Sequence, residues 1–355
     1  MRSKIILVLI AFFSLSAVFA FADILPVETK KEWKGQIFLA NQVKGVGLVD
    51  SYQEDWQDIS YIYDDALAVM ANMAMKNVGL AKEILDTISK EIKITSDGMP
   101  FESYHYYDTT GNGTGSSYCG NVGWLLQAFN IYQKTTGNRE YYSCQKKMAD
   151  FLLKLQDPKD GGLRGSISDT WKSTENNLAA YVALRNFGRI NGSAYYMQKA
   201  EKVKIFLKSR AIWDGQRFNR GPDDPTEVTD VQALGVLVLG NNYLSALSWA
   251  EVNLQTIKPF NGKVITGFDF NDDLDTLWSE GTLQMAFAFS KANNPLKGDY
   301  YYNEISQAIG LDGSLVLATN RGSASEYWTM EPWRAAAPTC WLIFYSTKFN
   351  PLVLY

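Results

Sequence analysis

Histidine and cysteine are scarce in this chain of 355 residues, which holds one histidine, His105, and three cysteines. So few nitrogen and sulfur ligands exclude a zinc site built on histidine and cysteine. A hydrolase of the Ser-His-Asp type would have to use His105 alone. Cys119 and Cys144 lie at unequal distances from the turn predicted near Gly137, so their Cα atoms would be too far apart for a disulfide. We therefore expect free, buried thiols.

Positive charge is also in short supply. The chain has 34 lysines and arginines against 38 aspartates and glutamates, a formal net charge of −4. A protein with this balance has no general attraction for nucleic acid or for an anionic membrane surface. We expect neither as a partner.

Long apolar runs are missing except at the start of the chain. Arg2 and Lys4 precede an apolar run over residues 5–19, and Ala20-Phe21-Ala22 follows it. This order is typical of a secretory signal peptide. We expect cleavage after Ala22, a single mature domain of residues 23–355, and a secreted or periplasmic location with no membrane contact after cleavage. An uncleaved anchor is the alternative, although the run is short for a spanning helix.

A short pattern recurs along the whole chain. Six segments each begin with a polar or acidic residue and continue into an apolar stretch rich in small residues. Their second residues are separated by 56, 55, 55, 50 and 54 positions. These residues are Asp64, Gly120, Glu175, Asp230, Glu280 and Arg334. A period near 55 fits a repeat of two helices, a turn and a loop.

The two helices of each unit differ in character. Residues 178–184 and 231–239 are apolar almost all round, which indicates buried helices, whereas residues 82–90 and 201–209 carry charges on one face only. The sequence therefore predicts an all-α protein, an (α/α)6 toroid in which six inner helices are wrapped by six outer ones. Little follows Phe344, so the outer helix that closes the ring should come from residues 29–40.

Acidic residues of the repeat should meet at one end of the toroid, because parallel inner helices begin at the same end. Helix capping alone would explain any one of these carboxylates. Capping needs no aromatic company, however, and the loops that lead into the inner helices are rich in aromatic rings, which stack on sugars. A carbohydrate is the predicted partner. The rings that we assign to substrate binding are Tyr63, Tyr118, Trp171, Trp278 and Trp328.

Several segments resemble the six-hairpin glycosidase superfamily of (α/α)6 barrels. Residues 47–52 and 60–69 look like the opening inner hairpin of bacterial members. Residues 171–177, Trp-Lys-Ser-Thr-Glu-Asn-Asn, are similar to the Trp-Glu-Glu-x-Asn stretch of glucoamylases that carries the general acid. Residues 324–328, Ala-Ser-Glu-Tyr-Trp, are similar to their Ser-Glu-Gln stretch, which carries the base.

This resemblance implies hydrolysis of a glycosidic bond with inversion. We also expect a monomer without cofactor or metal. Glu175 would be the general acid and Glu326 the base, with their carboxyl groups about 6.5 to 9.5 Å apart. Asp230 and Glu280 form the second candidate pair. Asp64 and Arg334 are assigned to substrate binding in the first subsite.

Other functions stay open. A polysaccharide lyase or epimerase on a similar toroid could use Asn121, Tyr118 and His105, but an anionic polymer would call for more arginine and lysine in these loops. New ultraviolet absorbance in the products would separate a lyase from a hydrolase. Non-catalytic glycan binding is a third reading. A terpene-cyclase-like toroid is a fourth, suggested by residues 156–162, but it lacks the Asp-x-Asp-Asp motif.

One acidic loop has the spacing of a calcium-binding EF-hand. Asp269, Asn271, Asp273 and Asp275 would occupy positions 1, 3, 5 and 7, and Glu280 position 12. Position 6 is Leu274, where the turn calls for glycine. We therefore expect a solvated or substrate-facing loop and no metal.

Overall fold

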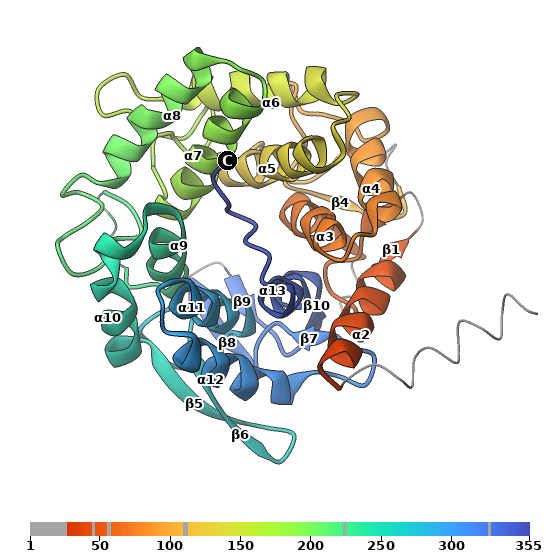
Figure 1. Ribbon diagram of the computed structural model, residues 1–355, viewed down its shortest axis with the longest axis vertical. Helices are drawn as coiled ribbons and strands as arrows, with labels where there is room; N and C mark the ends of the chain where they lie inside the picture. The colour runs from red at the N-terminus through yellow and green to blue at the C-terminus, as the bar shows by residue number, and fades with distance from the viewer. Residues whose placement is uncertain are drawn as a thin grey trace, which may run out of the picture.

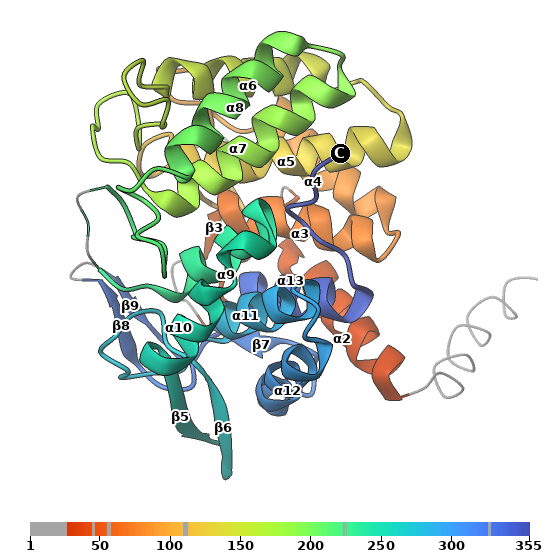
Figure 2. The ribbon, with the colours of Figure 1, turned by 60° about the vertical axis from the view of Figure 1, so that its left-hand side comes forward.

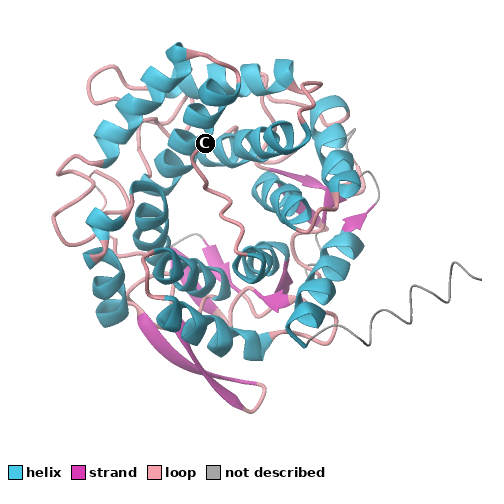
Figure 3. Cartoon of the chain, viewed as in Figure 1, coloured by secondary structure: helices cyan, strands magenta, loops and turns pink. Residues whose placement is uncertain are grey.

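The protein forms two concentric rings of helices (Figures 1 and 3). The computed structural model describes residues 27–44, 47–54, 58–108, 113–222, 224, 226–325 and 328–355. Two predictions fall outside these ranges, namely the signal peptide over residues 1–22 and the base Glu326. The all-α toroid predicted from the repeat is confirmed.

In the described part of the chain, the inner ring consists of six helices that are buried along most of their length. Their alanines and glycines allow close packing around the barrel axis, as the apolar small-residue pattern predicts. The six are α3 (Ile62–Ala74), α5 (Cys119–Thr136), α7 (Thr174–Ile190), α9 (Thr229–Leu239), α11 (Ser279–Lys291) and α13 (Ala336–Thr347).

The outer ring is amphipathic, as in α4, which buries Ala81, Ile84, Leu85 and Ile88 against the inner layer. Its helices are α2 (Val27–Gln42), α4 (Val78–Lys90), α6 (Tyr142–Leu155), α8 (Ala194–Leu207), α10 (Ser245–Asn253) and α12 (Pro295–Ile305). Helix α2 packs against α13 and α3. The prediction that a segment near residues 29–40 closes the ring is therefore confirmed.

Short antiparallel strand pairs decorate the rings. They are β1 (Val43–Lys44) with β2 (Leu48–Val49), β3 (Ile59–Tyr61) with β4 (Ser103–His105), β5 (Gln255–Phe260) with β6 (Lys263–Phe268), β7 (Leu315–Val316) with β10 (Arg334–Ala335), and β8 (Gly322–Ser325) with β9 (Trp328–Met330). The β5–β6 hairpin projects from the ring (Figure 2). Asn261 and Gly262 form its two-residue turn, and both have positive φ angles, as such turns require.

The C-terminal segment crosses the ring at the end where the inner helices finish (Figure 1). The side-chain amide of Gln127 in α5 donates to the carbonyl of Pro351 at 2.9 Å. Asn186 in α7 donates to the carbonyl of Val353 at 2.7 Å and accepts from the backbone N–H of Tyr355 at 3.0 Å. The tail thereby covers the far end of the barrel and leaves the helix N-termini as the accessible end.

Two smaller predictions can be checked on the described residues. Cys119, Cys144 and Cys340 are free thiols, as expected; Cys119 and Cys340 are also buried, whereas Cys144 is only half-buried. Within the described ranges, the helices lack the combination of length and apolar character that crossing a membrane requires.

Candidate active site

A cavity of about 600 Å³ opens where the inner helices begin. Residues from the first or second turn of all six inner helices line it, so the acids of the repeat meet in one place, as predicted. Among the described residues, seven aromatic rings and five carboxylic acids share its wall. The lining residues are Tyr52, Tyr61, Tyr63, Asp64, Glu102, Gly120, Asn121, Trp124, Glu175, Asn176, Asp230, Leu234, Phe270, Trp278, Glu280, Gln284, Leu317, Trp328 and Ala337.

Local sequence fixes how these acids are presented. Thr174, the first residue of α7, donates its hydroxyl to the carbonyl of Asn219 at 2.6 Å, and Thr229 of α9 donates in the same way to Asp269. Each hydroxyl ties the start of an inner helix to the loop of the following hairpin. The next residue in each helix, Glu175 or Asp230, lines the cavity.

Glu175 is held by an indole. The Nε1–H of Trp124, which lies one turn after the repeat position of α5, donates to Oε1 of Glu175 at 2.6 Å. Burial raises the pKa of Glu175 to about 7; the Trp124 hydrogen bond opposes this rise, and the charge of Asp230 adds to it. The carboxyl group is thus poised between its two protonation states near neutral pH.

Glu280 on α11 is more deeply buried, with 5% of its surface exposed. Tyr63 donates its hydroxyl to Oε1 of Glu280 at 2.5 Å, and Gln284 donates to the same oxygen at 3.1 Å. Burial raises the pKa of Glu280 to about 8, against the effect of the Tyr63 hydrogen bond. A helix N-terminus favours a carboxylate by only about 0.3 to 1 kcal/mol, so desolvation wins here.

The other two acids of the repeat differ from each other. Burial raises the pKa of Asp64 to about 7, and a hydrogen bond from Ser51 limits the rise. Burial raises the pKa of Asp230 to about 6, opposed by the backbone N–H of Val231 at 2.7 Å and by the charge of Arg220. Asp230 therefore retains the most carboxylate character of the four.

Tyr63 contacts both Glu280 and Trp124, the residue that holds Glu175. Its ring meets the Trp124 indole edge-on, with ring centroids 5.5 Å apart. Burial and the neighbouring Glu280 raise the pKa of Tyr63 well above its ordinary value. The phenol therefore keeps its proton and serves as a hydrogen-bond donor rather than a base.

Several predicted substrate-binding residues lie elsewhere than this cavity. Trp171 lines an adjoining pocket, and Tyr118 packs beside it with ring centroids 6.3 Å apart. Arg334 lies on β10 and pairs with Glu54 and with Asp312, the latter at 2.9 Å. These ion pairs account for its guanidinium, and Arg334 is not among the residues that line the cavity.

The prediction that Arg334 holds the sixth repeat position is wrong. Helix α13 begins at Ala336, and its second residue, Ala337, lines the cavity where Asp230 and Glu280 do so in their own helices. Arg334 precedes the helix, in a strand that pairs with β7. Glu326 lies outside the described residues, and Trp328, two positions later, lines the cavity.

Two cavity residues that sequence reasoning missed carried a usable signal. Trp124 follows Gly120 by four positions, and Gln284 follows Glu280 by four. Residues four apart share one face of a helix, so each lies directly behind a repeat position. Glu102 and Phe270, which come from loops, carried no comparable signal.

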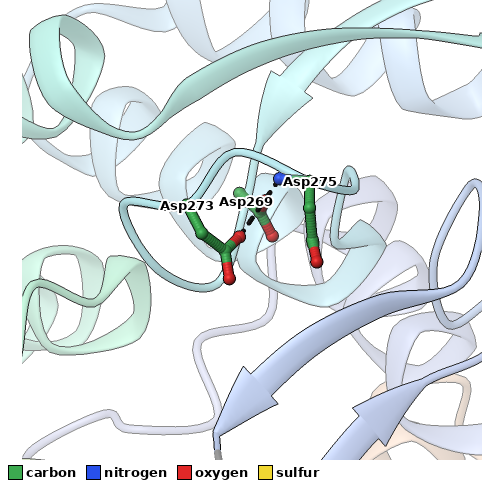
Figure 4. A group of neighbouring side chains, drawn as sticks. All are labelled: Asp269, Asp273 and Asp275. Atoms are coloured by element: carbon green, nitrogen blue, oxygen red, sulfur yellow. Dashed lines mark hydrogen bonds between the residues drawn. The ribbon is translucent and has the colours of Figure 1, made fainter.

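The acidic loop before α11 brings Asp269, Asp273 and Asp275 together, with carboxylate oxygens within 4.8 Å of one another (Figure 4). Loop hydrogen bonds occupy them: Asp273 accepts from the backbone N–H of Asp275 at 3.1 Å, and Asp275 accepts from that of Ser323 at 2.9 Å. Leu274 adopts a left-handed φ of 53° where the EF-hand pattern calls for glycine. These bonds hold the acidic loop against β8, and we assign no metal to the three aspartates.

Comparison of the sequence with models of known families found no match, and comparison with curated proteins found none. Solved structures do match. A glycosidase aligns with a TM-score of 0.68 at 12% identity over 91% of this chain and 96% of its own. D-mannose isomerase aligns at 0.67, with 10% identity and coverage of 92% and 98%. Cellobiose 2-epimerase from Bacillus thermoamylovorans aligns at 0.65, with 10% identity and coverage of 88% and 95%.

These likenesses confirm the fold. The chain has an (α/α)6 toroid like those of the glycosidase, the isomerase and the epimerase. At identities near 10%, these similarities establish the fold and not the activity. The similar structures themselves differ in activity, since they include an isomerase and an epimerase as well as glycosidases.

Proposed function

We propose that the protein is a glycoside hydrolase that cleaves a glycosidic bond of an oligosaccharide or polysaccharide. The observation that carries this proposal is the cavity wall, whose described residues include five carboxylic acids and seven aromatic rings. Paired carboxyl groups with shifted pKa values are the means by which glycosidases donate and accept protons. Aromatic rings provide the apolar faces on which sugar rings stack.

We assign Glu175 as the general acid of this reaction. With its pKa raised to about 7, Glu175 holds a proton near neutral pH and can give it to the glycosidic oxygen as the bond to the anomeric carbon breaks. Trp124 fixes the other carboxyl oxygen, which orients the group. A carboxylate takes a proton from water as the water oxygen bonds to the anomeric carbon, so the sum is the addition of one water molecule.

The resemblance to glucoamylases supports Glu326 as that carboxylate. Trp328, two positions later in the chain, lines the cavity. Asp230 is the second candidate, since it is the most readily ionised acid of the repeat. The proposed mechanism is inversion, with the acid and the base on opposite faces of the sugar ring.

A lyase or epimerase fits the cavity less well. Such enzymes need a base that removes a carbon-bound proton, and a lyase also needs cations that neutralise a uronate. Tyr63 keeps its proton, and His105 is exposed, stacks on Tyr107 and is not among the lining residues. Among the described residues that line the cavity there is no lysine, arginine or histidine.

The deciding experiment is a screen of neutral and uronate-containing oligosaccharides with two readouts. We expect new reducing ends without new ultraviolet absorbance from neutral oligosaccharides. Absorbance of an unsaturated product would identify a lyase instead. A changed sugar without any new reducing end would identify an epimerase or isomerase. Export from the cytoplasm, on the strength of residues 1–22, is part of the same proposal.

A further inference from the structure

A second pocket, of about 610 Å³, adjoins the cavity. Glu175, Asn176, Asp230 and Phe270 line both spaces, so they form one cleft with two lobes. Glu175 and Asp230 therefore stand at the junction between the lobes. A substrate that reaches from one lobe into the other must pass these two carboxyl groups.

Trp171 provides a platform in the second lobe. This residue is 49% exposed, although it lines a pocket. The indole lies against Gly165, where an added Cβ would come within 2.4 Å of a ring atom. The backbone N–H of Gly165 also donates to the carbonyl of Trp171 at 2.8 Å. One side of the ring is thus supported while much of its surface stays accessible for stacking on a sugar.

The loop that carries Trp171 is firmly held. The Lys172 side chain is only 10% exposed and pairs with Asp157 at 2.8 Å and Asp160 at 2.7 Å. The backbone N–H of Thr174 donates to the carbonyl of Arg220 at 2.8 Å, which fastens this loop to the one before α9. A platform that is ordered before binding loses little entropy when a ligand arrives.

Charge in the second lobe is balanced. The Lys172 ammonium is matched by two carboxylates, and Arg220 faces Asp224 at 3.5 Å. An anionic sugar would have to compete with these carboxylates for both cations. The lobe therefore favours a neutral ligand over a uronate or a sugar phosphate.

We propose that the second lobe is the subsite for the leaving-group sugar of a neutral oligosaccharide of at least two rings. This inference rests on the proposed hydrolase function. The scissile bond lies at the junction, within reach of Glu175, and the leaving sugar stacks on Trp171. Gly165 is a positioning residue, because only a residue without a side chain leaves the indole in place.

Three variants test this subsite: Trp171→Ala, Gly165→Ala, and Tyr195→Ala as a control that removes an exposed ring from outer helix α8. The substrates are a neutral oligosaccharide found in the screen and the glycosyl fluoride of the same sugar, whose leaving group is too small to reach the second lobe. For Trp171→Ala and Gly165→Ala we expect kcat/KM on the oligosaccharide to fall about 10-fold or more. Activity on the fluoride should be retained, and Tyr195→Ala should behave as the unmodified protein.

A binding measurement separates the two proposals. Calorimetry with glucose, maltotriose and cellotriose is carried out on Glu175→Gln with and without the Trp171 and Gly165 changes. If no oligosaccharide is hydrolysed but trisaccharide binding needs Trp171, the hydrolase proposal falls, and the second lobe binds a sugar that is not a leaving group. If oligosaccharides are hydrolysed and neither variant alters kcat/KM, the subsite proposal is overturned alone. Absence of both hydrolysis and binding overturns both.

Discussion

The indole N–H of Trp124 donates to Oε1 of Glu175 at 2.6 Å, and this bond stabilises the carboxylate form of the acid. Replacing Trp124 with phenylalanine keeps an aromatic ring but removes the donor. The pKa of Glu175 should then rise further, so the alkaline limb of the pH profile of kcat/KM should move to higher pH. The rate should also fall, because the acid loses its orientation. An unchanged profile would show that Glu175 is not the acid.

The assigned acid and base should respond differently to loss of their charge. Glu175→Gln and Glu326→Gln keep the side-chain shape, and each should lower kcat by about 10²- to 10⁴-fold. A nitrophenyl glycoside, whose leaving group needs no proton, should partly spare Glu175→Gln. Azide should partly rescue Glu326→Gln by replacing the activated water. Full activity in both variants would shift the assignment to Asp230 and Glu280.

Stability should fall as the pH rises from mildly acidic values to about 8. Burial raises the pKa values of Asp65 and Glu280 to about 8, so the folded protein holds protons that the unfolded chain releases. In that interval the folded state binds more protons, and rising pH therefore favours unfolding. Thermal melting across a pH series measures this trend. A melting temperature that climbs with pH through the interval would contradict it.

Glu280→Gln should stabilise the protein at about pH 8. A neutral amide removes the cost of a buried charge, so the free energy of unfolding at about pH 8 should rise by about 0.5 to 2 kcal/mol. The gain should shrink in mildly acidic buffer, where Glu280 is already protonated. Asp272→Asn, an exposed position in the acidic loop, serves as the control and should leave the melting temperature unchanged. Equal gains at both pH values would count against a buried charge.

The signal peptide is tested at the N-terminus of the exported protein. Sequencing should begin at Asp23, because the small residues Ala20 and Ala22 mark the predicted cleavage site. A mature protein that begins at Met1 would remove both the cleavage and the proposed location.

The ring was predictable because its signals are local. Small apolar residues repeat in each inner helix, and an acid follows the first residue of α7, α9 and α11. The β5–β6 hairpin was missed, although Asn261-Gly262 is a standard sequence signal for a two-residue turn. Arg334 was misassigned because the pattern was extended to a strand residue two positions before α13.

The contacts that shift the pKa values of the acids could not be predicted from the sequence. Tyr63 and Glu280 are 217 positions apart, and only closure of the ring brings the phenol to the carboxyl group. The support of Trp171 by Gly165 likewise depends on how one loop folds over another. From the sequence, the site could be predicted to lie at the helix N-termini, but the individual hydrogen bonds within it could not.

The C-terminal segment that crosses the barrel sets the order in which parts of the fold can form. Leu352 is buried, and Val353 and Tyr355 bond to Asn186, a residue made some 167 positions earlier. This end of the barrel therefore cannot be closed before Tyr355 has been synthesised. A fusion partner joined after Tyr355 would start beside this end, whereas one joined ahead of α2 would start on the outer ring, so the outer ring is the safer place for a tag or a tether.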